Sequence, residues 1–367
     1  MRDVPTFTLR FEHIPGVNDS EHPITIGFYT TEERPLLSER CWRPFDRGDA
    51  GRYEIRETKN AGKGMFSLDS HAAGGLVACD RPLVVFAIVD KGTKDGTVME
   101  RTLARMPAET RDVLLALHSC EPDAPSVESA IARTNRFEVG QVPEAFGPCC
   151  AVFNDLSRIN HCCAPNATFH WDPESLTGYI RALQPIAPGE EVFITYVANY
   201  APYHRRQETL PRLYAFMCTC ATCALPSRER IADDDVRQEC IRASEEAGNP
   251  PVVTAATAVV VTKAALRLAR RMRGAGLYEP HAWAAVSRAL VETACVLGDR
   301  ARAVRWALVA AGAVRAETGA DGGWDEVAAA PERTEAWLRD ERVGDATQSA
   351  GRVVWNGPQF CPECGAM

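Results

Sequence analysis

Three motifs follow one another closely within residues 158–223. They are Arg158-Ile159-Asn160-His161-Cys162-Cys163-Ala164-Pro165-Asn166, Gly189-Glu190-Glu191-Val192-Phe193-Ile194-Thr195-Tyr196 and Cys218-Thr219-Cys220-Ala221-Thr222-Cys223. The last motif brings three soft thiolate ligands together, whereas a closed structural zinc site needs four ligands. We therefore expect a fourth ligand from elsewhere in the chain, with Cys163 as the preferred candidate. The alternative is a group of reduced cysteines that bind no metal.

The composition sets limits on the fold and on the partners. At 367 residues the chain is long for one compact core, so two domains with some irregular segments are expected. A net charge of −8 argues against a broad nucleic-acid-binding surface, because phosphate contacts need an excess of Lys and Arg. We expect no direct contact with nucleic acid.

Neither a membrane span nor a secretory signal is predicted. No apolar run reaches about 18 residues, and the first residues lack the apolar core of a signal peptide. We expect an intracellular protein, in the nucleus or the cytoplasm, that contacts no membrane. In that compartment the 14 cysteines are expected to be thiols or metal ligands rather than disulfides.

The periodicity of apolar residues changes along the chain. Residues 1–50 are predicted to be an extension whose clearest strand covers residues 24–29. Residues 51–200 alternate like short strands, except for a helical insert over about 90–145. After the cysteine motif, residues 227–345 are alanine-rich and helical, and residues 346–367 form an irregular tail.

Two helical stripes in the C-terminal half predict a packed pair of helices. Gly298 and Asp299 separate them as a helix stop followed by a cap. Such pairs are similar to tetratricopeptide-type hairpins, but the full repeat signature is missing, so an ordinary helical bundle is the alternative. The stripes are Val286, Leu290, Ala294 and Leu297, then Val304, Leu308, Ala311 and Val314.

Taken in order, the motifs resemble a known family. Gly-Lys-Gly-x-Phe at residues 62–66, Asn-His-x-Cys-x-Pro-Asn, Gly-Glu-Glu-Val-x-x-x-Tyr and Cys-x-Cys-x-x-Cys look like a SET-domain lysine methyltransferase with its post-SET zinc segment. The resemblance covers about residues 52–225. Within the family, the helical insert and helical C-terminal region make the chain most similar to the SET-and-MYND group and its fungal relatives.

The resemblance implies an α+β fold with several parts. These are a SET β fold of small curved sheets with a pseudoknot-like core over residues 51–200, the helical insert, and a post-SET zinc segment over 201–226. An α-helical, tetratricopeptide-like C-terminal domain follows. The chain departs from the group in two ways. Residues 87–119 contain no cysteine and only one histidine, His118, so the MYND finger is missing, and Cys162 replaces the usual serine.

The resemblance also assigns S-adenosylmethionine as cofactor. Lys63, Gly64 and Met65 match the turn that places backbone groups against it, and glycine permits such a close approach. A plain β-turn is the alternative. Asn160 and His161 match the residues that hold the cofactor.

Four further residues receive roles from the resemblance. Asn135 matches an asparagine that contacts the cofactor from the insert, and Phe216 matches an aromatic residue against the adenine ring. Tyr196 matches the catalytic tyrosine, which also contacts the cofactor, and Tyr214 matches the second tyrosine of the lysine channel. Each could instead be a structural residue packed in a strand, in a helix or beside the zinc site.

The implied function is S-adenosylmethionine-dependent methyl transfer to a lysine side chain of a protein, histone or non-histone. The alternative is a catalytically weak SET-fold binding or scaffold protein that acts through its helical C-terminal domain. A small amine as acceptor is a third possibility. The expected partner is a protein that presents a lysine, and the expected oligomeric state is a monomer.

Some polar and cysteine residues have no such role. Glu190 and Glu191 are interpreted as a turn rather than an acid/base pair. Cys361 and Cys364 are interpreted as part of a disordered end, with half a zinc site or a redox pair as alternatives. Cys149, Cys150 and Cys162 stay unassigned.

Overall fold

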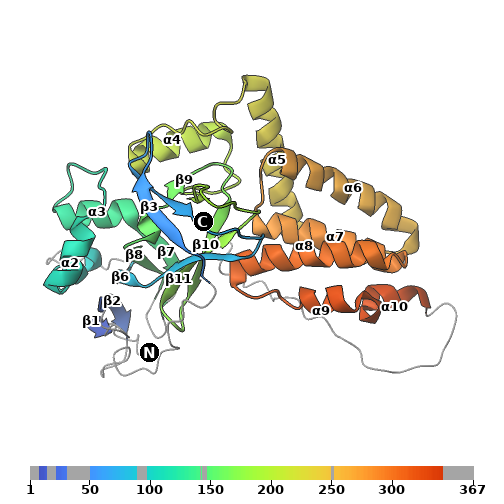
Figure 1. Ribbon diagram of the computed structural model, residues 1–367, viewed down its shortest axis with the longest axis horizontal. Helices are drawn as coiled ribbons and strands as arrows, with labels where there is room; N and C mark the ends of the chain where they lie inside the picture. The colour runs from blue at the N-terminus through green and yellow to red at the C-terminus, as the bar shows by residue number, and fades with distance from the viewer. Residues whose placement is uncertain are drawn as a thin grey trace, which may run out of the picture.

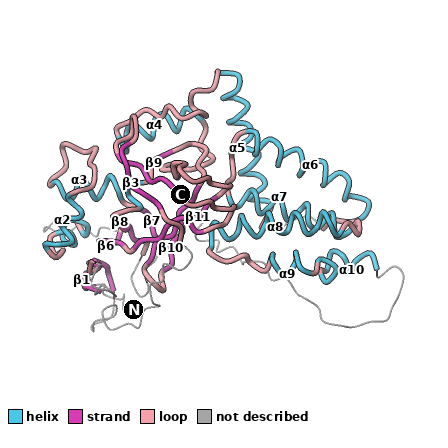
Figure 2. Tube along the Cα trace, in the orientation of Figure 1, coloured by secondary structure: helices cyan, strands magenta, loops and turns pink. Residues whose placement is uncertain are grey.

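The computed structural model describes residues 8–14, 22–30, 50–88, 97–140, 142, 147–248 and 252–341 (Figure 1). The strands gather in one part of the molecule, and the long C-terminal helices extend from it to one side (Figure 2). Cys361, Cys364 and the predicted tail over 346–367 lie outside the described residues.

The largest sheet has five strands in the order β1-β2-β6-β8-β7. Ile24, Ile26 and Phe28 of β2 are fully buried, which confirms the strand expected in this part of the chain. Strand β1 was not expected; its charged residues obscure the alternation of Leu9 and Phe11. The strands are β1 (Thr8–Ile14), β2 (Ile24–Thr30), β6 (Pro82–Ala87), β8 (Cys149–Phe153) and β7 (Phe137–Gly140).

Three smaller sheets complete the β-rich part, as expected for small separate sheets. One has the order β10-β11-β5, one is the hairpin β3–β4, and one is a parallel pair of only two residues each, β9 and β12. Their bounds are β3 (Tyr53–Glu57), β4 (Lys63–Ser67), β5 (Leu76–Asp80), β9 (Asn160–His161), β10 (Ala167–Asp172), β11 (Thr177–Ala182) and β12 (Phe193–Ile194).

The described residues of the predicted insert, 97–140 and 142, contain three short helices and then strand β7. The helices are α1 (Val98–Leu103), α2 (Ala108–Leu115) and α3 (Val127–Asn135). Thr97 begins the first with a capping box to Glu100, and Ser126 caps the third. Proline at position 107 precedes α2, where its fixed φ suits a helix start.

The C-terminal half is built from helices with their own core. Val286, Leu290 and Ala294 are buried as predicted, whereas Leu297 and Leu308 are 46% and 55% exposed. Leu297 caps its helix, and the buried face of α8 consists mainly of alanines and Trp306. The helices are α4 (Tyr203–Tyr214), α5 (Ser227–Glu246), α6 (Ala255–Gly274), α7 (Pro280–Val296), α8 (Arg300–Thr318), α9 (Trp324–Ala329) and α10 (Glu335–Glu341).

The turn between the two main helices follows the sequence prediction. Gly298 has a φ of 67°, and the Asp299 side chain accepts a hydrogen bond from the Arg302 amide at 3.0 Å. Among the described helices, none combines the length and the apolar content that a membrane span requires.

Helix α8 packs closely against the β-rich part. A side chain on Gly74, whose φ is 81°, would meet the Gly312 carbonyl oxygen at 2.8 Å, so both positions need a residue without bulk. Arg181 of β11 also donates to the Gly74 carbonyl at 3.2 Å. This contact fixes the helical region beside the strands that carry the site.

Candidate functional site

A large cavity of about 2010 Å³ opens between the β3–β4 hairpin, the end of α3, strand β9 and the segment after α4. Most of the residues singled out in the sequence meet here, although they come from widely separated parts of the chain. Gly64 and Met65 are not among the lining residues. The predicted residues that line it are Lys63, Asn135, Asn160, His161, Tyr196, Tyr214, Phe216, Cys218 and Cys220.

The two-residue pairing of β9 with β12 brings the Asn-His motif beside the tyrosine motif. Asn160 pairs with Phe193, and His161 pairs with Ile194. The Cys162 amide extends this contact by donating to the Ile194 carbonyl at 3.0 Å. Tyr196, which lies two residues after the end of β12, is therefore next to His161.

His161 connects the tyrosine to the cysteines. Its Nδ1 accepts a hydrogen bond from the Tyr196 amide at 3.0 Å, so its proton resides on Nε2, which lies 3.3 Å from the Cys163 sulfur. Burial lowers the pKa of His161 to about 4, so the ring is neutral near pH 7. The side chain thus holds the backbone of one motif against a thiol of another.

The hydroxyl of Tyr196 has a fixed direction. It donates to the Ile159 carbonyl at 2.6 Å. Burial raises the pKa of Tyr196 well above its usual value, so the phenol keeps its proton. With the proton directed to Ile159, the oxygen lone pairs can accept a hydrogen bond from a group in the cavity.

Two aromatic rings pack near the ring of Tyr196. The Tyr214 and Phe216 ring centroids lie 4.9 and 6.4 Å from that of Tyr196. Tyr214 ends α4, and Ala215, with a φ of 57°, turns the chain so that Phe216 also faces the group. Aromatic faces attract cations, so this arrangement suits a positively charged ligand.

The turn at Lys63 and Gly64 contacts Asn160, and Gly64 itself does not line the cavity. Asn160 donates from Nδ2 to the Lys63 carbonyl at 3.2 Å and to Glu191 Oε1 at 2.8 Å. A side chain on Gly64 would come within 2.5 Å of Glu191 and 3.0 Å of Asn160. Met65 is fully buried in the core. Gly64 therefore makes room for three side chains of the protein itself, those of Glu191, Thr58 and Asn160.

The paired glutamates act as structural acceptors. Glu191 binds Asn160, while Glu190 accepts from the Asn166 side chain at 3.2 Å and from the Ala187 amide at 3.0 Å. Gly189 precedes them with a φ of 81°. These contacts agree with the interpretation as a turn.

Asn135 lies at the end of α3 and lines the cavity, but its amide group already has partners. Nδ2 donates to the His118 carbonyl at 2.7 Å and to the Ile131 carbonyl at 2.8 Å. The side chain is 9% exposed. Its amide nitrogen thus joins the end of α3 to His118, in the segment between α2 and α3.

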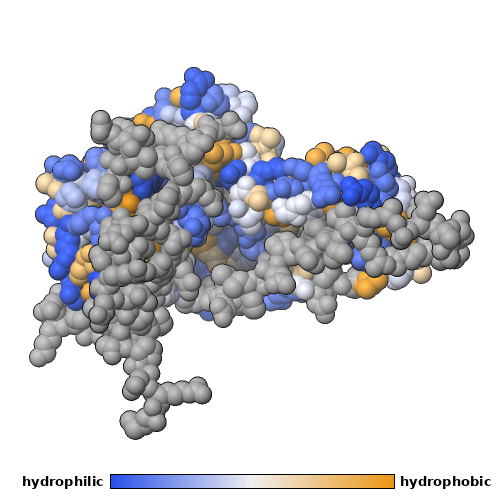
Figure 3. All heavy atoms as spheres, turned by 90° about the horizontal axis from the view of Figure 1, so that it is seen from below, coloured by the Kyte–Doolittle hydropathy of each residue, from blue (hydrophilic) through white to orange (hydrophobic). Residues whose placement is uncertain are grey.

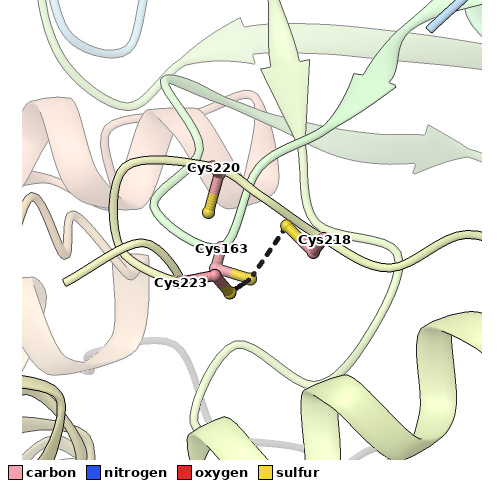
Figure 4. A group of neighbouring side chains, drawn as sticks. All are labelled: Cys163, Cys218, Cys220 and Cys223. Atoms are coloured by element: carbon pink, nitrogen blue, oxygen red, sulfur yellow. Dashed lines mark hydrogen bonds between the residues drawn. The ribbon is translucent and has the colours of Figure 1, made fainter. Parts of the chain in front are cut away.

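The four predicted cysteines converge on one point (Figure 4). The Sγ atoms of Cys163, Cys218, Cys220 and Cys223 all lie within 4.8 Å of one another, with Cys163 at 3.8 Å from Cys218 and 3.5 Å from Cys223. Tetrahedral zinc with Zn–S bonds of about 2.3 Å places sulfurs about 3.8 Å apart. The group could therefore hold a zinc ion.

Because the four thiols hydrogen-bond to one another, their pKa values shift in opposite directions: those of Cys163 and Cys218 are raised, and those of Cys220 and Cys223 are lowered. A hydrogen bond from Cys163 lowers the pKa of Cys223 to about 7. Hydrogen bonds from Cys162 and then from the other thiols lower the pKa of Cys220. Leu210 of α4 and the rings of Tyr196, Tyr214 and Phe216 pack in the same cluster as the cysteines.

The unassigned cysteines lie outside this group of four. Cys162 is half-buried and lines the cavity, next to Cys220. Cys149 and Cys150 are buried in β8, and burial raises the pKa of these thiols to about 11 and about 12. Sequence reasoning overlooked Arg206 and Arg237, which are buried beside the cysteines. The sequence pattern that points to them is Asp233, four residues before Arg237. That spacing is usually found between ion pairs on exposed helix faces, so it does not predict burial.

Comparison with known proteins agrees with the motifs. A model of the SET domain matches residues 62–197. The histone-lysine N-methyltransferase set5 of Schizosaccharomyces pombe is 23% identical over 187 residues, which are 51% of this chain and 55% of that protein. The human N-lysine methyltransferase SMYD2 is 34% identical over 98 residues, 25% of this chain and 22% of that protein. The chain thus spans about half the length of set5 and less than a quarter of SMYD2.

Similar solved structures include the SET domain of LSMT bound to lysine and AdoHcy, with a TM-score of 0.29 and 12% identity, over 80% of this chain and 90% of that one. Another is ctPRC2 bound to S-adenosylmethionine, with a TM-score of 0.26 and 14% identity, over 81% of this chain and 34% of that one. The match to the family model and the order of the motifs in the cavity agree. Residues 62–197 match the SET domain, and over part of its length the chain is similar to the lysine methyltransferases set5 and SMYD2.

Proposed function

We propose that the protein transfers a methyl group from S-adenosylmethionine to the lysine side chain of a protein substrate. The observation that carries this proposal is Tyr196, which lines the cavity with its hydroxyl held by Ile159 and with the rings of Tyr214 and Phe216 near its own. An in-line transfer between two bound groups needs no covalent step by the protein. Positioning and electrostatics then supply the rate enhancement.

The lining of the cavity suits S-adenosylmethionine, which when bound supplies an electrophilic methyl group on a sulfonium. Lys63, Asn160 and His161 offer backbone groups, and Phe216 offers a ring face for the adenine. Asn135 contributes from the insert. Gly64 acts indirectly, by leaving room for Asn160, and Met65 anchors the same strand in the core. Cys163, Cys218, Cys220 and Cys223 hold zinc and thereby fix the segment that carries Tyr214 and Phe216.

The protein must also favour the neutral form of the lysine amine. With a pKa of about 10.4, only about one lysine in a thousand is neutral near pH 7.4, a cost of about 4 kcal/mol. A half-buried aromatic channel lowers that pKa by desolvation. Tyr196 stays protonated and accepts a hydrogen bond from the amine, while Tyr214 limits the space around it. The rate per bound substrate should therefore rise with pH above neutral.

Replacing Tyr196 by Phe tests the proposal. Calorimetry should show S-adenosylmethionine binding unchanged in zinc-replete protein, whereas methyl transfer to histones and cell extract should fall about 100-fold or more. Tyr179→Phe on β11, which does not line the cavity, is the matched control and should keep its activity. Zinc-replete wild-type protein that binds no S-adenosylmethionine would contradict the proposal.

The acceptor belongs to the proposal as well, because the chain spans only part of its relatives. We propose a protein substrate inside the cell, histone or non-histone, with residues 227–345 as a separate domain beside the cavity. Proteome-wide labelling with a methyl-marked cofactor identifies the acceptor. Partners that bind the full chain without any becoming methylated would favour the scaffold function instead.

A further inference from the structure

Two arginines are the largest of the fully buried side chains. Arg206 of α4 is 1% exposed, and Arg237 of α5 is 0% exposed. Arginine is almost never fully buried without a partner of opposite charge, because losing the hydration of a cation is costly. Both arginines therefore require partners that offset their charge.

Arg237 joins the helical region to the cysteine group. Its Nη2 donates to the Cys163 carbonyl at 2.9 Å, and its Nε donates to Asp233 Oδ2 at 2.8 Å. A third hydrogen bond, from Nη1, reaches the Asn199 carbonyl. One side chain from α5 thus holds the backbone of a proposed metal ligand 74 residues earlier in the chain.

Arg206 approaches the same group from α4. Its Nη1 donates to the Ala201 carbonyl at 2.6 Å, and its Nη2 lies 3.6 Å from Asp233. Its Nε has no hydrogen-bond partner within the described part of the chain, although it is buried. Cys163 and Cys223 lie close enough for a thiolate at either position to interact with this guanidinium.

The buried charges do not balance within the protein. Two guanidiniums face one buried carboxylate, Asp233, so the buried side chains alone leave positive charge that, among the described residues, only the partly exposed Asp234 offsets. Asp234 is also near, at 3.6 Å from Arg206, but its side chain is 26% exposed and shares its charge with water. A zinc ion with four thiolates carries two negative charges. The excess of cations therefore has the sign that this group requires.

We propose that Arg206 and Arg237 form a cationic support for a zinc–tetrathiolate group, and that α5, through Arg237, makes the helical region part of what retains the metal. The inference rests on the proposed zinc site, but not on methyl transfer. The other contacts from α4 agree with it: Gln207 donates to the Cys218 carbonyl at 3.0 Å, and Leu210 packs against the cysteines. Groups that surround the ligands in this way tune how tightly a metal is held.

Zinc competition on the full-length, zinc-loaded chain tests the support. With a chromophoric chelator as competitor, Arg206→Gln should weaken zinc binding about 10- to 100-fold. Arg206→Lys keeps the charge and should recover most of that loss. Arg205→Gln removes an exposed arginine next to it on α4, whose side chain is 68% exposed, and should bind zinc like the wild type.

A second variant covers the case in which Arg206→Gln does not fold. Asp233→Asn removes a buried negative charge beside the site and should tighten zinc binding, with circular dichroism confirming an intact fold. The cationic support would be overturned if Asp233→Asn bound zinc as tightly as the wild type or more weakly. It would also be overturned if folded Arg206→Gln bound zinc like the wild type. Neither result would overturn the zinc site. Wild-type protein that binds no zinc would overturn the zinc site itself.

Discussion

The cavity region and the C-terminal helices hold their residues in place by different means. Around the cavity the elements are short: β9 and β12 have two residues each, and their positions depend on hydrogen bonds between distant segments. In the C-terminal half, α5 to α8 have 17 to 20 residues each and pack through a continuous apolar core. Local contacts dominate there.

This difference predicts how each region responds to damage. Short segments bury little apolar area of their own, so we expect polar contacts, and zinc if it binds as proposed, to fix them. Long helices bury a stripe at every turn and tolerate the loss of any single polar contact. Perturbing the metal should therefore affect one region, and perturbing the apolar core should affect the other.

Removing the metal should have the largest effect. A strong zinc chelator, or Cys218→Ser, should abolish S-adenosylmethionine binding and methyl transfer, because without zinc the remaining thiols no longer hold residues 196–223 against the Asn-His segment. Hydrogen exchange should rise throughout that stretch and stay low in α7 and α8. Cys162→Ser is the control, since Cys162 is not in the group of four. If hydrogen exchange rose as much in α7 as in residues 196–223, the proposed difference between the two regions would be wrong.

A cavity in the helical core should give the next largest effect. Leu290 is fully buried in α7, so Leu290→Ala should lower the free energy of unfolding by about 2 to 5 kcal/mol. Leu297→Ala, at a 46% exposed position at the end of the same helix, should change it by about 0.5 kcal/mol or less. Denaturant unfolding measures both. The folded Leu290→Ala protein should keep its zinc; a lower zinc content would show that the two regions share one core.

An ion-pair network in the helical region should give a smaller, pH-dependent effect. His281 of α7 contacts Glu279 at 3.0 Å and Glu317 of α8 at 2.6 Å, and the hydrogen bond to Glu279, followed by that to Glu317, raises the pKa of His281 to about 10. Because the folded pKa exceeds the unfolded one, the stabilisation is complete below about pH 6.5 and is lost as the pH rises through about 10.

His281→Gln should therefore lower the Tm at pH 6 by about 2 to 4 °C, with the gap to wild type closing by pH 10. Thermal scans at both pH values measure this. A gap that stays constant with pH would show that the histidine stabilises by packing rather than by charge.

The smallest predicted effect concerns the turn after α4. Ala215 has a φ of 57°, which costs a residue with a side chain about 1 to 2 kcal/mol. Ala215→Gly should stabilise the fold by up to about 1 kcal/mol, once the greater freedom of unfolded glycine is subtracted. Ala247→Gly, at a helix end with a φ of −62°, should instead destabilise it by about 0.5 to 1 kcal/mol.

The sequence predicted nine of the residues that line the cavity, because the motifs that contain most of them could be recognised although they lie far apart in the chain. It also predicted the fourth cysteine, since three thiolates call for one more ligand. It could not reveal the burial of Arg206 and Arg237, because charged residues on a helix are ordinarily exposed and only tertiary packing covers them. The bulk of Leu308 suggested a buried stripe, but small alanines determine which face of α8 packs. Strand β1 could not be predicted because its charged residues obscure the alternation of apolar and polar side chains.

The distance along the chain between the cysteines has a consequence during synthesis. Cys163 precedes Cys218 by 55 residues. At about 5 to 20 residues per second, the Asn-His segment leaves the ribosome roughly 3 to 11 s before the thiols that complete its metal group. During that interval Cys163 is a free thiol on an unfinished sheet, without its partners. If the four cysteines bind zinc as proposed, oxidation of Cys163 in those first seconds would prevent the group from forming.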